Sequence, residues 1–214
     1  MSVHEGVQPA QRTFSDYMRL RFKGVLDPVA GFLLRLGLMP NTITLLGLAG
    51  NAISIIFLAR GNLLIGGLLV LVMGPIDALD GAMARLRGEA SDFGAFVDSV
   101  TDRYSELLIY AGLIYFFLFS GQSAMVVLSF VAAAGSVLVS YVKARAESLG
   151  FEARGGMLTR LERYLILAPA LVLTGLGLTQ AVLVGVGLIA ILANVTALQR
   201  ILAVRHQARM RSGG

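Results

Sequence analysis

The sequence contains no cysteine and few charged residues. Of its 214 residues only 14% are Asp, Glu, Lys or Arg, whereas 56% are hydrophobic and the mean hydropathy is +0.76. Without cysteine, disulfide bonds and thiolate chemistry are excluded. A water-soluble domain of this size needs a far more polar surface, so the composition predicts an all-α integral membrane protein.

Acidic residues are fewer than basic ones, which gives a formal net charge of +5 and an isoelectric point of about 10.0. A basic balance can indicate nucleic-acid binding, but here the charges flank apolar stretches. We therefore interpret them as determinants of membrane topology and as ligands for anionic substrates, and we expect no nucleic-acid partner. No cleavable signal peptide is expected, because residues 1–12 form a polar leader ahead of any apolar stretch.

Six stretches are long and apolar enough to cross a bilayer, whose core of about 30 Å requires roughly 20 residues of helix. They cover residues 42–60, 62–84, 94–119, 122–146, 161–178 and 181–203. We expect these six transmembrane helices to form a catalytic domain over residues 41–204, followed by a basic cytoplasmic tail at 205–214. The glycine pairs Gly66–Gly67 and Gly185/Gly187 are expected where helices approach closely.

Ahead of the spans, residues 13–36 mix basic and apolar side chains. The basic residues are Arg19, Arg21, Lys23 and Arg35. This mixture predicts an N-terminal amphipathic helix lying at the membrane interface, interrupted near Asp27 and Pro28. The alternative is a disordered basic leader.

Basic residues are distributed unevenly between the two ends of the predicted spans. The N-terminal segment, the turn at 84–93, the stretch 143–163 and the C-terminal tail hold nearly all of them, while the three opposite turns hold only Arg60. Positively charged loops stay on the cytoplasmic side of a membrane. We therefore expect both termini in the cytoplasm.

Four aspartates flank the turn between the second and third spans. Asp77 and Asp80 are three residues apart, and Asp98 and Asp102 are four apart, so each pair lies on one face of a helix. We expect the two helices to be antiparallel and adjacent, with the four carboxylates converging near the cytoplasmic edge. Because like charges repel and carboxylates are costly in a membrane, this convergence predicts bound divalent cations. All-oxygen ligands favour Mg²⁺ or Mn²⁺ over Zn²⁺, and two ions would suit four carboxylates.

The acidic cluster has two competing interpretations. In one, the aspartates sit at solvated helix ends and pair with Arg85, Arg87 and Arg103. In the other, they form the ion site of a transporter or channel, which predicts acids near mid-span and broken helices in matching halves. The acids lie instead at one edge of the predicted bundle, and Pro75 and Pro169 do not occupy matching halves.

The acidic stretch also contains a complete motif, D-x2-D-G-x2-A-R-x8-G-x3-D-x3-D. It is formed by Asp77, Asp80, Gly81, Ala84, Arg85, Gly94, Asp98 and Asp102. Upstream, the segment 40–44 reads P-N-T-I-T and is similar to a P-N-x-x-T entry into the first span. In these features the chain resembles the CDP-alcohol phosphotransferases (CDP-alcohol phosphatidyltransferases) over nearly its whole length after residue 13.

This resemblance implies an activity and a set of site residues. Such enzymes displace CMP from a CDP-linked lipid by attack of an alcohol. The implied metal ligands are Asp77, Asp80, Asp98 and Asp102, and the implied catalytic residues are Asp98 and the general base Asp102. The implied contacts to the CDP donor come from Asn41, Thr44, Gly81, Ala84, Arg85 and Gly94. The resemblance further implies a homodimer in the plasma membrane of a prokaryote, with its active site facing the cytoplasm.

Cations at the ends of the later spans predict a pocket for an anionic acceptor. They are Lys143 in the string S-Y-V-K-A-R-A-E, Arg160, Arg163 and Arg200. The alternative is that they anchor lipid headgroups. Together with Arg103 after the last motif aspartate, the set resembles phosphatidylinositol-phosphate synthases, which implies inositol 1-phosphate as acceptor and CDP-diacylglycerol or CDP-archaeol as donor. Glycerol 3-phosphate, the acceptor of phosphatidylglycerophosphate synthases, is the alternative.

Overall fold

The computed structural model describes residues 14–88, 91–153 and 155–212, and every regular element in this part of the chain is an α-helix. The helices are α1 (Phe14–Arg35), α2 (Pro40–Ala59), α3 (Leu63–Arg87), α4 (Asp92–Phe119), α5 (Ser123–Ser148), α6 (Arg160–Gly175) and α7 (Ala181–Ser212). The expected all-α class is confirmed. The predicted polar leader, residues 1–12, lies outside the described residues.

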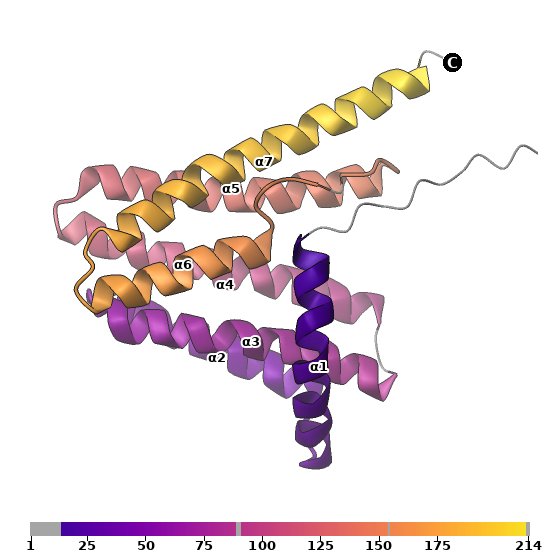
Figure 1. Ribbon diagram of the computed structural model, residues 1–214, viewed down its shortest axis with the longest axis horizontal. Coiled ribbons are helices and arrows are strands. Elements are labelled where there is room, and N and C mark those ends of the chain that lie inside the picture. The colour runs from indigo at the N-terminus through magenta and orange to yellow at the C-terminus, as the bar shows by residue number, and fades with distance from the viewer. Residues whose placement is uncertain (1–13, 89–90, 154, 213–214) are drawn as a thin grey trace, which may run out of the picture.

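Helices α2 to α7 lie side by side, and α1 crosses them at one end (Figure 1). The short turns after α2, α4 and α6 gather at one end of this bundle. The turn after α3, the longer segment after α5 and the C-terminus lie at the other end. The turns after α2 and α4 are tight because Gly61 and Gly121 adopt φ angles of 76° and 70°, which glycine reaches without steric penalty.

Close packing connects some of these helices and not others. The closely packed pairs are α2–α3, α5–α7, α2–α4, α3–α6, α4–α5, α6–α7 and α1–α3. Helices α3 and α4 are not in this set, although both pack on α2. The two aspartate-bearing helices, expected to be adjacent, are thus each packed closely on α2 rather than on one another.

Glycines allow two of these helix pairs to approach closely. A Cβ atom on Gly67 of α3 would lie 2.7 Å from Leu171 Cβ and 2.8 Å from the Val172 backbone nitrogen of α6. A Cβ on Gly185 of α7 would lie 2.7 Å from Ala170 Cβ, also on α6. Both positions confirm the expected packing role, because side chains there would force the helices apart.

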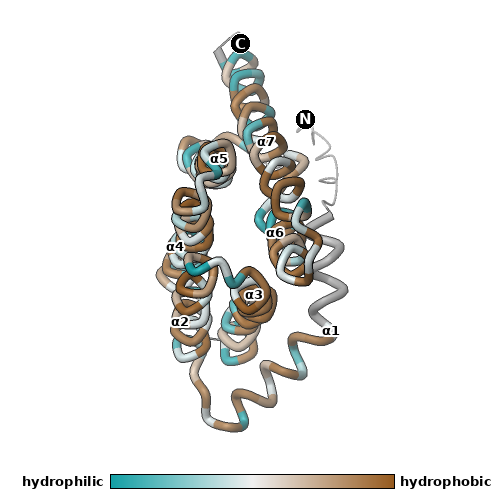
Figure 2. The backbone as a smooth tube through the Cα atoms, turned by 90° about the vertical axis from the view of Figure 1, so that its left-hand side faces the viewer, coloured by the Kyte–Doolittle hydropathy of each residue, from teal (hydrophilic) through white to brown (hydrophobic). Residues whose placement is uncertain are grey.

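Much of the bundle consists of hydrophobic residues, drawn in brown in Figure 2, and many of them lie on its outer surface. Large hydrophobic side chains such as Leu45, Phe119, Val127 and Ile191 are well exposed. A surface of this kind indicates a protein that contacts lipid. By length and composition, α2, α3, α5 and α7 could each cross a membrane. Helix α6 has 16 residues, and the first half of α4 is rich in charge.

The helix ends differ from expectation in two places. Helix α1 continues through Pro28, so the predicted interruption is wrong; a proline inside a helix removes one backbone hydrogen bond but need not end the helix. Helix α7 continues to Ser212, through most of the predicted tail. The extension is fixed by contacts with the segment after α5: Gln207 exchanges two hydrogen bonds with the Glu152 backbone, and Arg211 lies 4.3 Å over the Phe151 ring.

Candidate active site

The motif begins on α3 and continues on α4, on the two sides of a short turn. Gly88, with φ at 69°, ends α3 immediately after Arg87. Ser91 caps α4, and its Oγ accepts a hydrogen bond of 3.1 Å from the Gly94 backbone N–H. The motif glycine Gly94 thus takes part in the capped first turn of α4, a role that the sequence did not suggest.

Two of the aspartates share one guanidinium group. Arg160, the first residue of α6, places Nη2 at 3.3 Å from Asp77 Oδ2 and Nη1 at 2.6 Å from Asp102 Oδ2. Both carboxylates are largely buried, with side chains 11% and 12% exposed. The carboxylate of Asp77 lies directly against Gly47 of α2, where any side chain would collide with it. Asp102 Oδ2 also pairs with Arg103 Nη2 at 3.5 Å, as one of the two competing interpretations expected. Two guanidinium groups therefore already neutralise these carboxylates, between helices α3, α4 and α6.

The other two aspartates lie nearby with different partners. The Thr44 hydroxyl donates a hydrogen bond of 2.5 Å to Asp80 Oδ2, which ties the entry of α2 to α3. Asp98 is exposed. It is close enough to Asp77, Asp80 and Asp102 to interact electrostatically with all three. The structure thus brings all four aspartates into one region.

No group of three or more Asp, Glu, His or Cys side chains within the described parts of the chain has the geometry of a metal site. The physical reason is visible at Arg160, whose guanidinium lies between Asp77 and Asp102. The donor set still fits a hard cation, because it consists of carboxylate oxygen atoms, two of which already accept from the guanidinium of Arg160.

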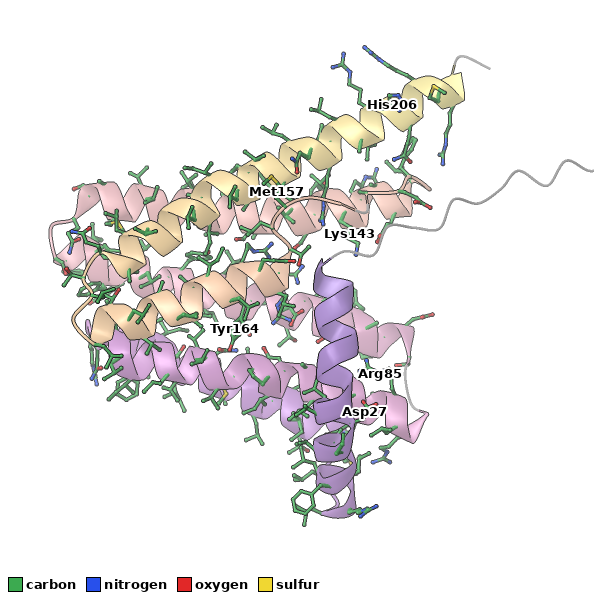
Figure 3. All side chains as sticks on the ribbon, in the orientation of Figure 1. Asp27, Arg85, Lys143, Met157, Tyr164 and His206 are labelled. Atoms are coloured by element: carbon green, nitrogen blue, oxygen red, sulfur yellow. The ribbon has the colours of Figure 1, made fainter. Side chains whose placement is uncertain are left out.

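The expected donor-binding residues lie along the same edge. Gly81 is open: the nearest atom to a Cβ placed there would be Arg85 Nη1 at 3.4 Å. Arg85 forms no ion pair with the described residues and lies near the end of α3 (Figure 3). Asn41 is exposed at the start of α2, and Ala84 provides a carbonyl that helps to end α3.

The expected acceptor cations do not form one group of free charges. Lys143, on α5, is half exposed and lies 3.9 Å from Glu147 (Figure 3). Arg163 is 2% exposed and pairs with Glu106. Arg200 is buried and donates to the carbonyls of Gly155 at 2.8 Å and Val139 at 2.6 Å.

This arrangement differs from the sequence-based expectation for a physical reason. A buried guanidinium needs several acceptors, and the fold provides them from Glu106 and from backbone carbonyls. Of the four expected cations, Lys143 and Arg160 keep substantially exposed side chains, at 48% and 39%. They are the ones best able to reach an external anion.

A small cavity of about 50 Å³ lies beneath the aspartates and includes residues that the sequence analysis missed. Its polar lining comes from α2, α3, α4 and α6: Asn51, Asp77, Asp102, Ser105, Glu106, Tyr110, Arg160, Arg163 and Tyr164. Tyr164 reaches from α6 to α3, where its hydroxyl donates to the Val70 carbonyl at 3.0 Å (Figure 3). One signal for Glu106 was available, because it follows Asp98 and Asp102 at the same four-residue spacing.

These groups have a definite chemical capacity. Convergent carboxylates can hold hard cations or accept a proton, and the cations beside them can bind phosphate oxygens. An open backbone at Gly81 permits close approach of a ligand. The combination suits transfer of a phosphorylated group at the membrane edge.

Comparison with known proteins agrees with this chemistry. The chain matches the CDP-alcohol phosphatidyltransferase family over residues 37–198. A phosphatidylinositol phosphate synthase of Mycobacteroides abscessus is 38% identical over 190 residues, which are 87% of this chain and 86% of that protein.

Two solved structures of the phosphatidylinositol phosphate synthase of Mycobacterium tuberculosis are similar to this fold. The structure with CDP-DAG bound has a TM-score of 0.78 and 32% identity, covering 84% of this chain and 93% of that one. The structure in complex with manganese and citrate has a TM-score of 0.78 and 33% identity, covering 84% of this chain and 88% of that one.

Proposed function

The chain belongs to the CDP-alcohol phosphatidyltransferase family, and from this premise we propose that it transfers a phosphatidyl group from CDP-diacylglycerol to inositol 1-phosphate. CMP is released and a phosphatidylinositol phosphate is formed. The observation that carries the proposal is the complete eight-residue motif, with all four of its aspartates in one region around Arg160. The names of the relatives support the choice of acceptor.

Asp77, Asp80, Asp98 and Asp102 would hold the metal, as Mg²⁺ or Mn²⁺ and in our proposal as two ions. When bound, such ions neutralise the diphosphate and the charge that develops on the leaving CMP. Arg160 would release one or both of its carboxylates to them. The manganese complex of the mycobacterial synthase supports this assignment.

The donor would lie along the exposed edge of α3. We assign its cytidine and diphosphate to Gly81 and Arg85, because the glycine leaves its backbone open and the guanidinium has no ion-pair partner among the described residues. Asn41 and Thr44 would complete this side from α2. Ala84 and Gly94 would contribute mainly by shaping the ends of α3 and α4 around the donor.

Asp102 would accept the proton from the attacking hydroxyl of the acceptor. The hydroxyl oxygen forms a new bond to the lipid-linked phosphorus, and the bond from that phosphorus to the CMP oxygen breaks. Lys143 and Arg160 would bind the phosphate of the acceptor, since their side chains are the accessible ones. Arg163 and Arg200 would support this pocket from behind.

In the membrane, we propose that α2 to α7 form six spans, with α4 and α6 shielded by the four more apolar helices. Helix α1, the segment predicted at 13–36, would lie at the cytoplasmic interface of a prokaryotic plasma membrane. Residues 41–204 would be the catalytic domain, with both termini in the cytoplasm. A homodimer belongs to the same proposal, and light scattering of the detergent-solubilised protein tests it.

The deciding experiment measures CMP release by the purified protein with CDP-diacylglycerol and a panel of acceptor alcohols. We expect turnover with inositol 1-phosphate in Mg²⁺ or Mn²⁺, little with unphosphorylated inositol, and none in EDTA until metal is restored. Preference for glycerol 3-phosphate would instead indicate a phosphatidylglycerophosphate synthase. EDTA-resistant activity would contradict the metal assignment.

A further inference from the structure

Two ion pairs at successive helical turns connect α4 and α6, namely Asp102–Arg160 and Glu106–Arg163. Asp102 and Glu106 are one turn apart on α4, and Arg160 and Arg163 are one turn apart on α6. Arg160 Nη1 lies 2.6 Å from Asp102 Oδ2, while Arg163 Nε and Nη2 lie 2.6 and 2.9 Å from the two Glu106 oxygens. Helices α4 and α6 are not among the closely packed pairs, but buried apolar side chains of both, such as Leu113 and Leu171, belong to one hydrophobic core.

The arginines of the two ion pairs differ in their exposure to solvent. Arg160 is 39% exposed and divides its donors between two aspartates, so it can exchange partners. Arg163 is 2% exposed, and its third nitrogen, Nη1, donates to the Leu158 carbonyl at 3.4 Å. A buried guanidinium with this complete set of partners cannot turn to another anion without leaving Glu106 uncompensated.

Asp102, Glu106 and Arg163 line the same small cavity. If Glu106 lost its charge, Asp102 would be the next carboxylate on the same face of α4 and the natural new partner for Arg163. Asp102 is also the carboxylate to which we assign proton acceptance. The Glu106–Arg163 pair therefore determines whether Arg163 also competes for the Asp102 carboxylate.

We propose that Glu106 is a positioning residue for the transfer reaction: it holds Arg163 in a closed pair and so prevents Arg163 from adding a third guanidinium, beside Arg103 and Arg160, to the Asp102 carboxylate. The inference rests on the proposed function. It differs from the sequence-based expectation that Arg163 binds the acceptor phosphate. When Glu106 is replaced by Gln, the positioning role predicts a lower kcat, whereas acceptor binding by Arg163 predicts an unchanged kcat and a lower acceptor KM.

The test compares Glu106→Gln, Arg163→Gln and the double variant in the CMP-release assay, with separate titrations of CDP-diacylglycerol and inositol 1-phosphate. We expect Glu106→Gln to lower kcat about 100-fold, the loss typical of an impaired general base, with both KM values within about threefold of wild type. Adding Arg163→Gln removes the uncompensated cation and should restore kcat at least about tenfold. Glu152→Gln, at an exposed glutamate after α5, is the matched control and should leave all parameters unchanged.

A Glu106→Gln variant with unchanged kcat and a lower acceptor KM would overturn the proposal, because Arg163 would then be an acceptor ligand that Glu106 restrains. If Glu106→Gln does not fold, the double variant decides, since it buries neither charge. A folded double variant within about tenfold of wild-type kcat supports positioning, whereas one at least 100-fold slower with a raised acceptor KM contradicts it. Wild-type protein that releases CMP with no acceptor contradicts the proposed function itself.

Discussion

At the scale of single residues, the site is defined by how each carboxylate is neutralised. Asp77 and Asp102 share Arg160, and Asp102 also pairs with Arg103. Asp80 accepts from Thr44, and Asp98 is exposed. An uncompensated carboxylate near the membrane is costly, so each arrangement shows how the protein tolerates these charges. The same carboxylates are the ones that a metal would use.

Replacing Asp77, Asp80, Asp98 or Asp102 by Asn is expected to lower CMP release by about 100-fold or more while the fold is kept. Each change removes a metal ligand or the general base, and the amide preserves the shape of the side chain. Turnover and the thermal midpoint should be measured together. Asp92→Asn, in the exposed first turn of α4, is the control. Near-normal turnover in two or more motif variants would contradict the assignment.

Replacing Arg160 by Ala is expected to tighten Mn²⁺ binding by about tenfold, because the guanidinium that competes for Asp77 and Asp102 is gone. Manganese titration followed by electron paramagnetic resonance measures the affinity directly, without substrate. Arg145→Ala serves as control, since this exposed arginine contacts Ser148 rather than an aspartate. An unchanged or weaker affinity in Arg160→Ala would mean that Arg160 does not compete with the metal.

At the scale of the helices, α3 and α6 hold the site through backbone proximity. The contact at Gly67 fixes α6 against α3, and Arg160 and Tyr164 project from α6 toward the aspartates and the Val70 carbonyl. A wider separation of these helices would displace Arg160 from Asp77. Packing in the apolar half of the bundle therefore determines geometry at its charged end.

Gly67→Ala is expected to lower the thermal midpoint in detergent, since its Cβ would overlap the α6 backbone and such overpacking costs about 1–3 kcal/mol. Gly31→Ala on α1 is the matched control, because nothing lies within 4 Å of a Cβ placed there. Alanine has the higher helix propensity, so the control should be neutral or slightly stabilising. Equal midpoints for both variants would show that the contact at Gly67 is looser than described.

The sequence predicted the elements well because apolar runs and glycine turns are local signals. The six stretches expected as spans coincide with helices α2 to α7, of which α2, α3, α5 and α7 are long and apolar enough to cross a membrane. The largest differences in bounds are at α6 and at the extended end of α7. Aspartate spacing predicted that the four carboxylates share one region, but among the described residues no three of them have the geometry of a metal site. The Glu106–Arg163 pair and the bridging position of Arg160 could not be predicted, because they join α4 and α6 through a tertiary arrangement that no spacing encodes.

At the scale of the whole molecule, the two ends of the bundle differ in chemistry. Figure 1 shows the turns after α2, α4 and α6 at one end of the bundle, and among the described residues these turns contain Arg60 as their one basic residue. The motif lies toward the other end, with the described basic residues of the α3 and α7 C-termini and of the α6 N-terminus. This polarity matches a membrane protein with one reactive face. It supports the proposed cytoplasmic orientation.

The absence of native cysteine permits a direct test of that orientation. We expect Ser120→Cys, after α4, to react with a membrane-impermeant maleimide on intact spheroplasts, and Ser148→Cys, at the end of α5, to react only after the membrane is disrupted. Both serines are exposed, so accessibility differs only by side. The cysteine-free parent is the blank. The reverse labelling pattern would invert the topology.

The two ion pairs between α4 and α6 also have a consequence for the insertion of the chain into the membrane during synthesis. A ribosome delivers α4 to the membrane before α6 exists, so Asp102 and Glu106 enter without Arg160 and Arg163, and Asp102 has only Arg103 of α4 itself as a partner. Helix α4 should therefore be a poor insertion substrate by itself and should depend on its already inserted neighbour α2, against which it packs. A chain that stops after α5 would lack both arginines of α6, and Glu106 would then have no ion-pair partner from that helix.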